Sequence, residues 1–299
     1  MNNEFILMDR VQKIKQVINE YGQENFYISF SGGKDSTVLS WLIDYAFPHN
    51  SIPRVYSDTG IELNMVKEFV YNTASKDKRF EIIKPHINIR LILEKYGYPF
   101  KSKMHSVYVK KYQSKGFAYK SVRAYTKKEL TLSGKPISEP CPQKLMYQFT
   151  EENNLKISDM CCIKIKEEPL VEWAKTHNKS ININGIMRDE GGRRQNSSCL
   201  VFSNKKLKTF QPLVAVNKEW EEYLIDHYNI EICDIYKPPF NFERTGCKGC
   251  PFNRHIQNEL DILEQIFPEE KKQCEIIWKP VYDEYRRIGY RLKKRGEQE

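Results

Sequence analysis

Apolar residues in the first third of the chain form short continuous runs separated by helix-spaced patterns. The runs at 26–30, 52–57 and 81–84 predict strands, because each is short and is bounded by polar or turn residues. Residues 9–21 and 37–45 carry apolar side chains at the three- and four-residue spacing of amphipathic helices. This alternation predicts βαβ units with right-handed crossovers, and therefore an α/β fold built on a parallel sheet.

The pattern changes after residue 100. Residues 104–158 are polar and only weakly periodic, so we expect them to form helices inserted into the core fold. A strand expected at 181–188 and a helix expected at 220–228 return to the α/β pattern. One buried face of the insertion is expected from Leu145, Met146, Tyr147 and Phe149. The predicted parts are a core of residues 1–100 and 159–235, a basic, mostly helical insertion at 101–158, and a cysteine-bearing helical segment at 236–299.

The first predicted strand ends in the string Ser31-Gly32-Gly33-Lys34-Asp35-Ser36, which leads into a helix. The two glycines allow positive φ and close backbone approach, and the amides that open a helix favour phosphate oxygens. Ser31 and Ser36 add hydroxyl donors and Lys34 adds a mobile positive charge, while Asp35 could orient the loop or help to hold a magnesium ion. The alternative is a tight turn without a ligand. We expect the loop to bind nucleotide phosphates.

The second predicted strand ends in Asp58-Thr59-Gly60, with Glu62 close behind. This position is the carboxyl edge of the sheet, where open α/β sheets bind their ligands. An acid at this edge accepts hydrogen bonds from a ribose or helps to hold a metal ion. The alternative is that Asp58 or Thr59 caps the helix expected from about Asn64.

The composition is that of a globular protein, with 40% hydrophobic and 29% charged residues and no run of eighteen apolar residues. No charged-then-apolar leader opens the sequence, so we expect a cytoplasmic protein without a membrane segment.

Lysine and arginine number 48 against 39 acidic residues, and the excess is concentrated between Lys101 and Lys128. This segment holds nine basic residues and no acid. Between them lie the aromatic residues Tyr108, Tyr112, Phe117, Tyr119 and Tyr125. Cations that alternate with rings suit nucleic acid, because cations contact phosphates and rings stack on bases. A solvated surface insertion is the alternative, and the sequence does not decide between them.

Eight cysteines in a chain without a secretory leader argue against a disulfide framework. Four of them are grouped, as the adjacent pair Cys161-Cys162 and as Cys247-x-x-Cys250. Adjacent cysteines suit one structural zinc ion poorly, whereas a cluster with four iron corners accepts neighbouring thiolates. We therefore expect a [4Fe-4S] cluster on Cys161, Cys162, Cys247 and Cys250, with a four-cysteine zinc site as the alternative. The isolated cysteines are expected to be small buried residues: Cys141, Cys199, Cys233 and Cys274.

These motifs, in this order, resemble the phosphoadenosine phosphosulfate (PAPS) reductase family of the adenine nucleotide α-hydrolase superfamily. The carriers of the resemblance are Ser-Gly-Gly-Lys-Asp-Ser, the Asp-Thr-Gly segment, the arginine-rich segment from Gly185 to Arg194, and the paired cysteines of the iron–sulfur branch. The resemblance implies a Rossmann-like, HUP-type sheet. It also implies that Arg188, with Arg193 or Arg194, clamps phosphate or sulfate, and that Lys164 or Lys166 lies near the cluster sulfurs. The segment Gly185–Arg188 departs by one inserted position from the family spacing.

The reaction follows less directly from the resemblance. Family reductases of this branch use a cysteine on a mobile C-terminal tail, but Cys274 stands in a helical pattern that begins at Pro268. We therefore expect an ATP pyrophosphatase, with Lys34, Asp35 and Arg188 as catalytic residues and with ATP and Mg²⁺ bound. It would adenylate an acceptor for sulfur transfer, as in nucleic-acid thiolation or DNA phosphorothioation, with a cysteine desulfurase or another sulfur donor as partner. The alternatives are a sulfonucleotide (PAPS or APS) reductase and a nucleotide-sensing subunit without turnover.

Overall fold

A computed structural model describes residues 3–294, apart from the side chains of Glu190 and Arg193. The chain divides into two compact units. Unit 1 comprises residues 1–86 and 166–246, and unit 2 comprises residues 87–165 and 247–299. The expected insertion and the cysteine-bearing C-terminal segment thus lie in one unit, and the divisions fall near His86 and Gly246 rather than at residues 100 and 235.

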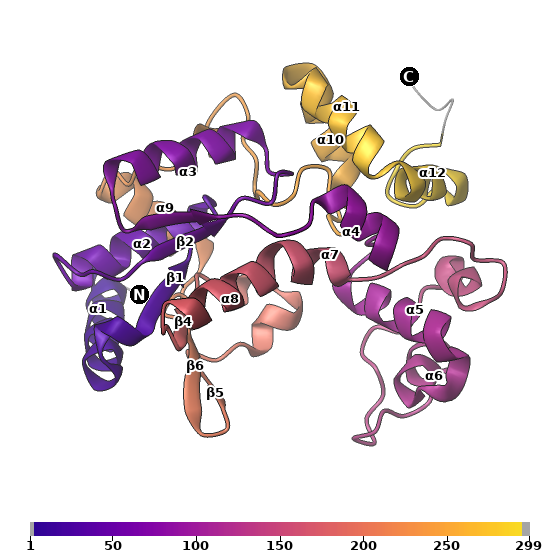
Figure 1. Ribbon diagram of the computed structural model, residues 1–299, viewed down its shortest axis with the longest axis horizontal. Coiled ribbons are helices and arrows are strands. Elements are labelled where there is room, and N and C mark those ends of the chain that lie inside the picture. The colour runs from indigo at the N-terminus through magenta and orange to yellow at the C-terminus, as the bar shows by residue number, and fades with distance from the viewer. Residues whose placement is uncertain (1–2, 295–299) are drawn as a thin grey trace. The chain divides into compact units, whose positions relative to one another are not determined.

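Unit 1 contains one six-stranded sheet in the order β3-β2-β1-β4-β6-β5 (Figure 1). All neighbouring strands are parallel except the β5–β6 hairpin at one edge, which is antiparallel. The elements of this unit are α1 (Asn3–Tyr21), β1 (Phe26–Ser29), α2 (Lys34–Ala46), β2 (Arg54–Ser57), α3 (Asn64–Lys76), β3 (Phe80–Ile83), α8 (Glu168–Thr176), β4 (Ile181–Ile183), β5 (Leu200–Ser203), β6 (Lys206–Phe210) and α9 (Lys218–His227). The expected Rossmann-like α/β fold is confirmed.

The strand order fixes where a ligand fits. From β1 the chain crosses to β2 on one side of it, while β4 lies on the other side, so the order reverses at β1. Ligands of open α/β sheets bind at such a reversal, beyond the carboxyl ends of the strands. The loop at 31–36 follows β1, and Gly185 follows β4, which is shorter than the strand expected at 181–188.

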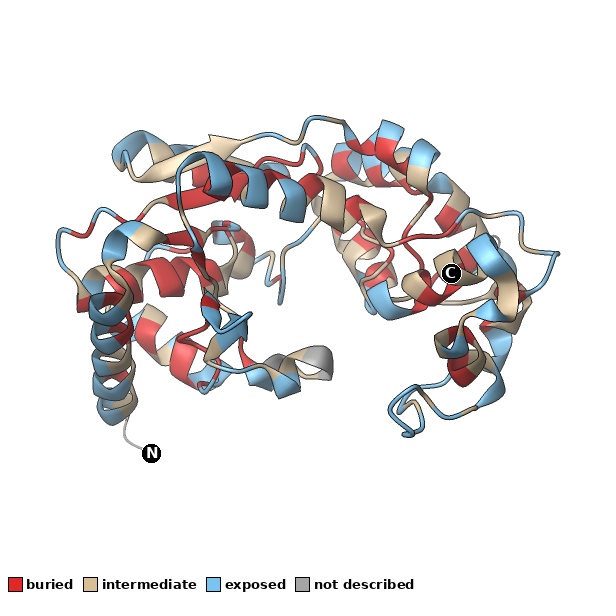
Figure 2. Ribbon diagram, turned by 60° about the horizontal axis from the view of Figure 1, so that its bottom comes forward, coloured by how far each residue is buried: buried red, intermediate tan, exposed pale blue. Residues whose placement is uncertain are grey.

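The two faces of the sheet are covered by different helices. Residues Phe26 and Ile28 of β1 belong to a core shared with α1, α2 and α9. Tyr27, between them, points to the opposite face, where it contacts Trp173 of α8. Figure 2 shows the buried residues of unit 1 along the strands and the inner faces of the helices, with the outer face of α1 exposed. This doubly covered sheet explains why β2 is buried along its whole length.

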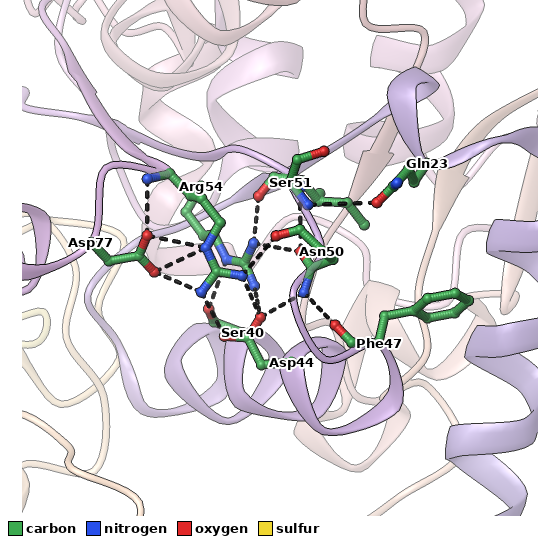
Figure 3. Close-up of polar contacts among 10 residues, drawn as sticks. Gln23, Ser40, Asp44, Phe47, Asn50, Ser51, Arg54 and Asp77 are labelled. Atoms are coloured by element: carbon green, nitrogen blue, oxygen red, sulfur yellow. Dashed lines mark hydrogen bonds and ion pairs between the residues drawn. The ribbon is translucent and has the colours of Figure 1, made fainter.

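A buried arginine connects β2 to α2 (Figure 3). The Arg54 side chain is fully buried and donates to Asp44 Oδ1 at 2.6 Å, Asn50 Oδ1 at 2.9 Å and Ser40 Oγ at 3.1 Å. Arg79 donates to the same Asp44 oxygen at 2.6 Å. Burial lowers the pKa of Arg54 to about 10, against the opposing charge of Asp44. The cluster connects the start of β2 to α2, whose first turn includes the end of the loop at 31–36.

Unit 2 is helical, as expected for the insertion. Its helices are α4 (Ile89–Tyr96), α5 (Lys103–Lys115), α6 (Lys120–Lys127), α7 (Met160–Cys162), α10 (Ile256–Ile266), α11 (Pro268–Ile277) and α12 (Lys279–Ile288). From α7 the chain continues through a π-helical turn, Ile163–Glu167, into α8. His105 of α5 is buried between the hydroxyl of Tyr125 (2.9 Å) and the side-chain oxygen of Gln148 (2.5 Å). Burial lowers its pKa to about 4, so the imidazole is a neutral part of the core.

Candidate functional site

The loop after β1 is closed by its own side chains. The Ser31 amide donates to Ser36 Oγ at 3.1 Å, and Ser36 Oγ donates to the Gly33 carbonyl at 2.9 Å. Gly32 has a φ of +71°, and a Cβ at this position would lie 2.5 Å from a methyl carbon of Val70 on α3. Only glycine fits both the conformation and the space. The loop is therefore a fixed turn. The N-cap residue of α2 is Gly33, which has no side chain to cap the helix.

Lys34 is the positively charged residue of this loop, and it faces two acids of α9. Its Nζ lies 3.5 Å from Glu222 Oε1 and 3.8 Å from Glu221 Oε2. The Lys34 side chain is 17% exposed, Glu222 is exposed, and Glu221 is buried. The lysine thus has one solvated and one buried carboxylate as neighbours. Neither acid was predicted from the sequence as a site residue.

Glu221 is unusual because it is a buried carboxyl group without hydrogen-bond partners. It is 1% exposed, and neither side-chain oxygen has a partner in the structure. Burial and, to a lesser extent, the charge of Asp35 raise the pKa of Glu221 to about 8, against the opposing charge of Lys34. Burying a carboxylate without hydrogen bonds is costly, and Lys34 at 3.8 Å offsets only part of this cost, so the group is protonated at neutral pH. One sequence signal could have pointed to Glu221: the helical spacing of Trp220 and Leu224 places it next to the core-facing side of its helix.

The loops after β1 and β4 meet at Gly185. A Cβ there would lie 2.9 Å from the Asp35 carbonyl oxygen, so glycine is required for the approach. Arg194, from the segment after β4, is half-buried; burial lowers its pKa while the charge of Asp35 opposes the shift. Arg188 is exposed, and its Nε donates to the Ser197 carbonyl at 2.8 Å. Arg194 therefore lies within electrostatic reach of the loop's acid, whereas the expected clamp residue Arg188 donates a hydrogen bond within its own segment. The side chain of Arg193 lies outside the described residues.

The acids after β2 are bound within their own segment. Asp58 accepts hydrogen bonds from the Gly60 amide (3.1 Å) and Tyr71 hydroxyl (2.8 Å) and pairs with Lys67 at 3.0 Å. Burial raises the pKa of Asp58, but these three partners outweigh it and the net pKa is lowered. The N-cap of α3 is Leu63, so the alternative that Asp58 or Thr59 caps this helix is wrong.

Glu62 keeps one oxygen available. Its Oε1 accepts from the hydroxyl (2.5 Å) and the amide (3.3 Å) of Thr59, while its buried Oε2 has no partner. Glu62 lines a cavity of about 120 Å³ beyond the ends of β1 and β2, which Ser31 and Lys166 also line. Pockets that bury a drug-sized ligand measure about 300–1,000 Å³. The cavity therefore has room for one part of a nucleotide.

One contact is seen for each of the two lysines expected near the cluster sulfurs. Lys166 lines the cavity of unit 1, and Lys164 lies with its Nζ 5.4 Å from the centre of the Tyr96 ring. The role of either lysine beside the cluster sulfurs stays a prediction.

The four grouped cysteines all lie in unit 2. Cys161 is buried, and Cys162, Cys247 and Cys250 are half-buried. A hydrogen bond that the Cys161 thiol donates to Cys162, burial, and the charges of the other three cysteines raise the pKa of Cys161. Among the described residues, no three Cys, His, Asp or Glu side chains are grouped tightly enough to hold one metal ion. The chemistry of the donor set, four thiols that act electrostatically on one another, still fits a thiolate-bound iron–sulfur cluster.

The isolated cysteines differ in burial. Cys274 and Cys233 are buried, as expected, but Cys141 and Cys199 are only half-buried, so the expectation was wrong for these two. Cys274 lies in α11, and a Cβ on Gly249 would lie 2.7 Å from its Sγ. Burial raises the pKa of Cys274 to about 12. A protonated, packed thiol is a poor nucleophile.

The aromatic residues of the basic segment are buried to different degrees in unit 2. Tyr108 and Tyr125 are buried and stack with ring centres 4.5 Å apart. Tyr112 packs against Phe117 and Phe149. Tyr108 and Tyr125 are therefore not available to stack on bases, which corrects the nucleic-acid interpretation for these two rings, whereas Tyr112, Phe117 and Tyr119 are half-buried. Exposed lysines remain at 103, 115, 120, 127 and 128.

A parallel sheet with a phosphate-type loop at its switch point defines the class: an α/β protein with a Rossmann-like nucleotide-binding fold. Residues 121–253, less than half of the chain, match the family model of the phosphoadenosine phosphosulfate reductase domain. The matched part includes Gly185, Arg188 and the four grouped cysteines, and it begins after the loop at 31–36. No curated protein matches the sequence.

Several solved structures resemble the chain at low identity. A PAPS reductase from Candida auris in its phosphate complex is 15% identical, over 71% of this chain and 76% of that chain, with a TM-score of 0.39. The U34-tRNA thiolase from Methanococcus maripaludis with its [4Fe-4S] cluster is 13% identical, over 99% and 83%, with a TM-score of 0.39. An NH3-dependent NAD synthetase from Campylobacter jejuni is 13% identical, over 94% and 95%, with a TM-score of 0.42. These TM-scores are below 0.5, so the likenesses carry no argument about function.

In residues 3–294, no helix combines the length and the apolar character needed to span a bilayer.

Proposed function

We propose that the protein cleaves ATP to AMP and pyrophosphate at the loop Ser31–Ser36 and transfers AMP to an acceptor that then receives sulfur. The observation that carries the proposal is the loop itself, a fixed turn at the sheet's switch point with Lys34 at the start of α2. Phosphate oxygens are favoured at such a position by the helix amides and by the lysine. The family match over residues 121–253 supports an enzyme that uses an adenine nucleotide.

The proposed chemistry is an in-line displacement at the α-phosphorus. An oxygen of the acceptor forms a bond to this phosphorus, the bond to the bridging oxygen breaks, and pyrophosphate leaves with its electron pair and a magnesium ion. Lys34 neutralises the charge that develops on the leaving group, and the Ser31–Ser36 contacts keep the loop in place for it. Arg194 balances the negative charge of Asp35. Positioning and electrostatics would supply most of the rate.

Sulfur transfer would use the four grouped cysteines. Cys161, Cys162, Cys247 and Cys250 would hold a [4Fe-4S] cluster, which when bound carries the sulfur that displaces AMP from the acceptor. Nucleic acid is the acceptor that the exposed lysines of α5 and α6 favour, and a cysteine desulfurase or another donor would provide the sulfur.

A sulfonucleotide reductase is the second candidate, because the matched family is named for that activity. Such an enzyme would need a cysteine that reaches the substrate's sulfur. Cys274 and Cys233 are buried, and burial raises the pKa of both thiols. The packing of Cys274 against Gly249 therefore favours ATP cleavage over reduction.

The deciding experiment is incubation with ATP labelled at the α-phosphate, followed by separation of the products. AMP with pyrophosphate supports the proposal, whereas sulfite released from PAPS or APS supports the reductase. Nucleotide binding without any product would indicate a nucleotide-sensing subunit. Lys34→Ala should abolish cleavage while the melting temperature stays unchanged, because Lys34 lies outside the core. Lys76→Ala, an exposed lysine of α3, is the matched control and should cleave at the wild-type rate.

A further inference from the structure

One half-buried carboxylate, that of Glu259, binds the backbone before Cys250 and a side chain after it. Glu259 of α10 accepts a hydrogen bond from the Gly249 amide at 2.8 Å through Oε1 and one from the Asn253 side-chain amide at 2.5 Å through Oε2. Both donors are neutral amides, one just before Cys250 and the other three residues after it. Burial of a carboxylate is costly unless its oxygens are satisfied, and here each oxygen is.

The carbonyls of the same loop are held by aromatic side chains. Trp278 Nε1 donates to the Lys248 carbonyl at 2.9 Å, the Tyr282 hydroxyl to the Gly249 carbonyl at 2.5 Å, and the Tyr285 hydroxyl to the Pro251 carbonyl at 2.9 Å. Trp278 follows α11, and the two tyrosines belong to α12. The polypeptide from Lys248 to Pro251 is therefore fixed by side chains from the C-terminal helices.

The lysine between the two cysteines faces α11. Lys248 is 4% exposed, its Nζ lies 3.3 Å from Glu270 Oε2, and it donates to Gln273 Oε1 at 2.5 Å. Its charge is therefore paired with a buried carboxylate of α11. Glu270 and Gln273 add a side-chain anchor to the backbone anchors of the loop.

From these contacts we infer that Glu259 is a positioning residue for the thiols of Cys247 and Cys250, holding the C-x-x-C loop in its metal-binding shape before metal arrives. The inference rests on the proposed cluster site. Gly249 supports it, because its φ is +61° and a Cβ would lie 2.5 Å from the Tyr282 hydroxyl, so the turn has a single tightly packed conformation. A prebuilt loop lowers the ordering cost of binding, and partners of this kind typically change metal affinity by about 10–100-fold.

The test compares Glu259→Gln with Glu264→Gln. Glutamine at 259 keeps the volume but places an NH₂ group against a donor amide, so one of the two hydrogen bonds is lost. Glu264 lies on the same helix, and its exposed side chain pairs with Lys271, so it controls for the charge change. Tyr282→Phe, which keeps the ring and removes the bond to the Gly249 carbonyl, is a second variant in case Glu259→Gln does not fold.

Two readouts report on the loop without any assay of activity. The first is the affinity of metal-free protein for Co²⁺ alone, followed by thiolate-to-metal absorption. The second is the rate at which an iron chelator removes iron from anaerobically reconstituted protein. We expect Glu259→Gln to bind Co²⁺ about tenfold more weakly and to lose iron correspondingly faster, with a smaller effect in the same direction for Tyr282→Phe. Glu264→Gln should match the wild type in both.

Wild-type behaviour of folded Glu259→Gln and Tyr282→Phe in the Co²⁺ titration would overturn the inference, whatever the ATP assay gives. A wild-type protein that cleaves no ATP, but whose Co²⁺ affinity falls on Glu259→Gln, would refute the proposed reaction and support the inference. The two failures are therefore distinguishable.

Discussion

A Cβ atom on Gly185 would lie 2.9 Å from the backbone carbonyl oxygen of Asp35. Two loops that are far apart in the sequence, one after β1 and one after β4, thus touch at a point where only hydrogen fits. The contact sets how closely the arginine-bearing segment approaches the loop.

Gly185→Ala should therefore separate the two loops and weaken pyrophosphate and ATP binding by roughly tenfold or more, because small displacements at a reacting centre are costly. Calorimetric titration with pyrophosphate measures the effect. Gly134→Ala, in unit 2, is the control for replacing a glycine, since a Cβ there would meet no atom within 4 Å; unlike Gly185, Gly134 has a positive φ, so this control carries backbone strain without a clash. Equal affinities of wild type and Gly185→Ala would show that the loop contact has no part in binding.

The elements near the loop could be predicted from sequence because their signals are local. The apolar run before Ser31, the two glycines and the helical spacing after Lys34 lie within about twenty positions, and the structure has the strand, turn and helix there. The α3 start at Asn64 was likewise marked by local spacing. Such features need no knowledge of what packs against them.

The remaining features depend on tertiary packing. Glu221 lies in an acidic stretch that reads as a solvated helix face, and only the fold buries it against Lys34. Tyr108 and Tyr125 suggested a stacking surface, but α5 and α6 fold so that these rings stack on each other. The sequence does not distinguish Arg188 from Arg194, because both are arginines of the same segment. Only the folded turn after β4 brings Arg194 within electrostatic reach of Asp35.

The basic segment gives a prediction for nucleic acid. Because Tyr108 and Tyr125 are buried, binding should depend mainly on phosphate contacts, and the affinity should fall by about 0.9 log units per log unit of salt for each phosphate neutralised. A variant with alanine at Lys115, Lys120 and Lys127 should bind more weakly and with a smaller salt slope. Alanine at Lys76, Lys84 and Lys205, exposed lysines of unit 1, is the control. Failure of the wild type to bind at low salt would favour a small-molecule acceptor.

Glu221 gives a prediction for stability against pH. Its pKa is raised from 4.5 to about 8 in the folded protein, so between these values the native state holds a proton that the unfolded chain has released. Its contribution is therefore fully present below about pH 4.5 and is lost as the pH rises to about 8.

Urea unfolding of wild type and Glu221→Gln between pH 5 and 9 measures this contribution. The glutamine variant cannot ionise, so the wild type should lose stability relative to it as the pH rises and should level off above about pH 8. Glu222→Gln is the control: that side chain is exposed, and its removal should leave the pH dependence of the wild type in place. Parallel curves for wild type and Glu221→Gln would mean that the carboxyl group stays ionised in the folded protein, stabilised by the neighbouring Lys34.

Cys274 separates the two enzyme candidates. Its thiol packs against Gly249, so Cys274→Ser buries a hydroxyl in apolar surroundings and should cost about 1–3 kcal/mol of stability. Cys274→Ala leaves a small cavity instead and should cost less. Both variants should cleave ATP at the wild-type rate per folded molecule. A reductase nucleophile behaves in the opposite way, because either substitution would remove all sulfite release from PAPS or APS without lowering the melting temperature. Thermal melting and a sulfite assay on the two variants therefore decide between a packed core thiol and a nucleophile, and a stable variant that has lost sulfite release would replace ATP cleavage with reduction as the proposed reaction.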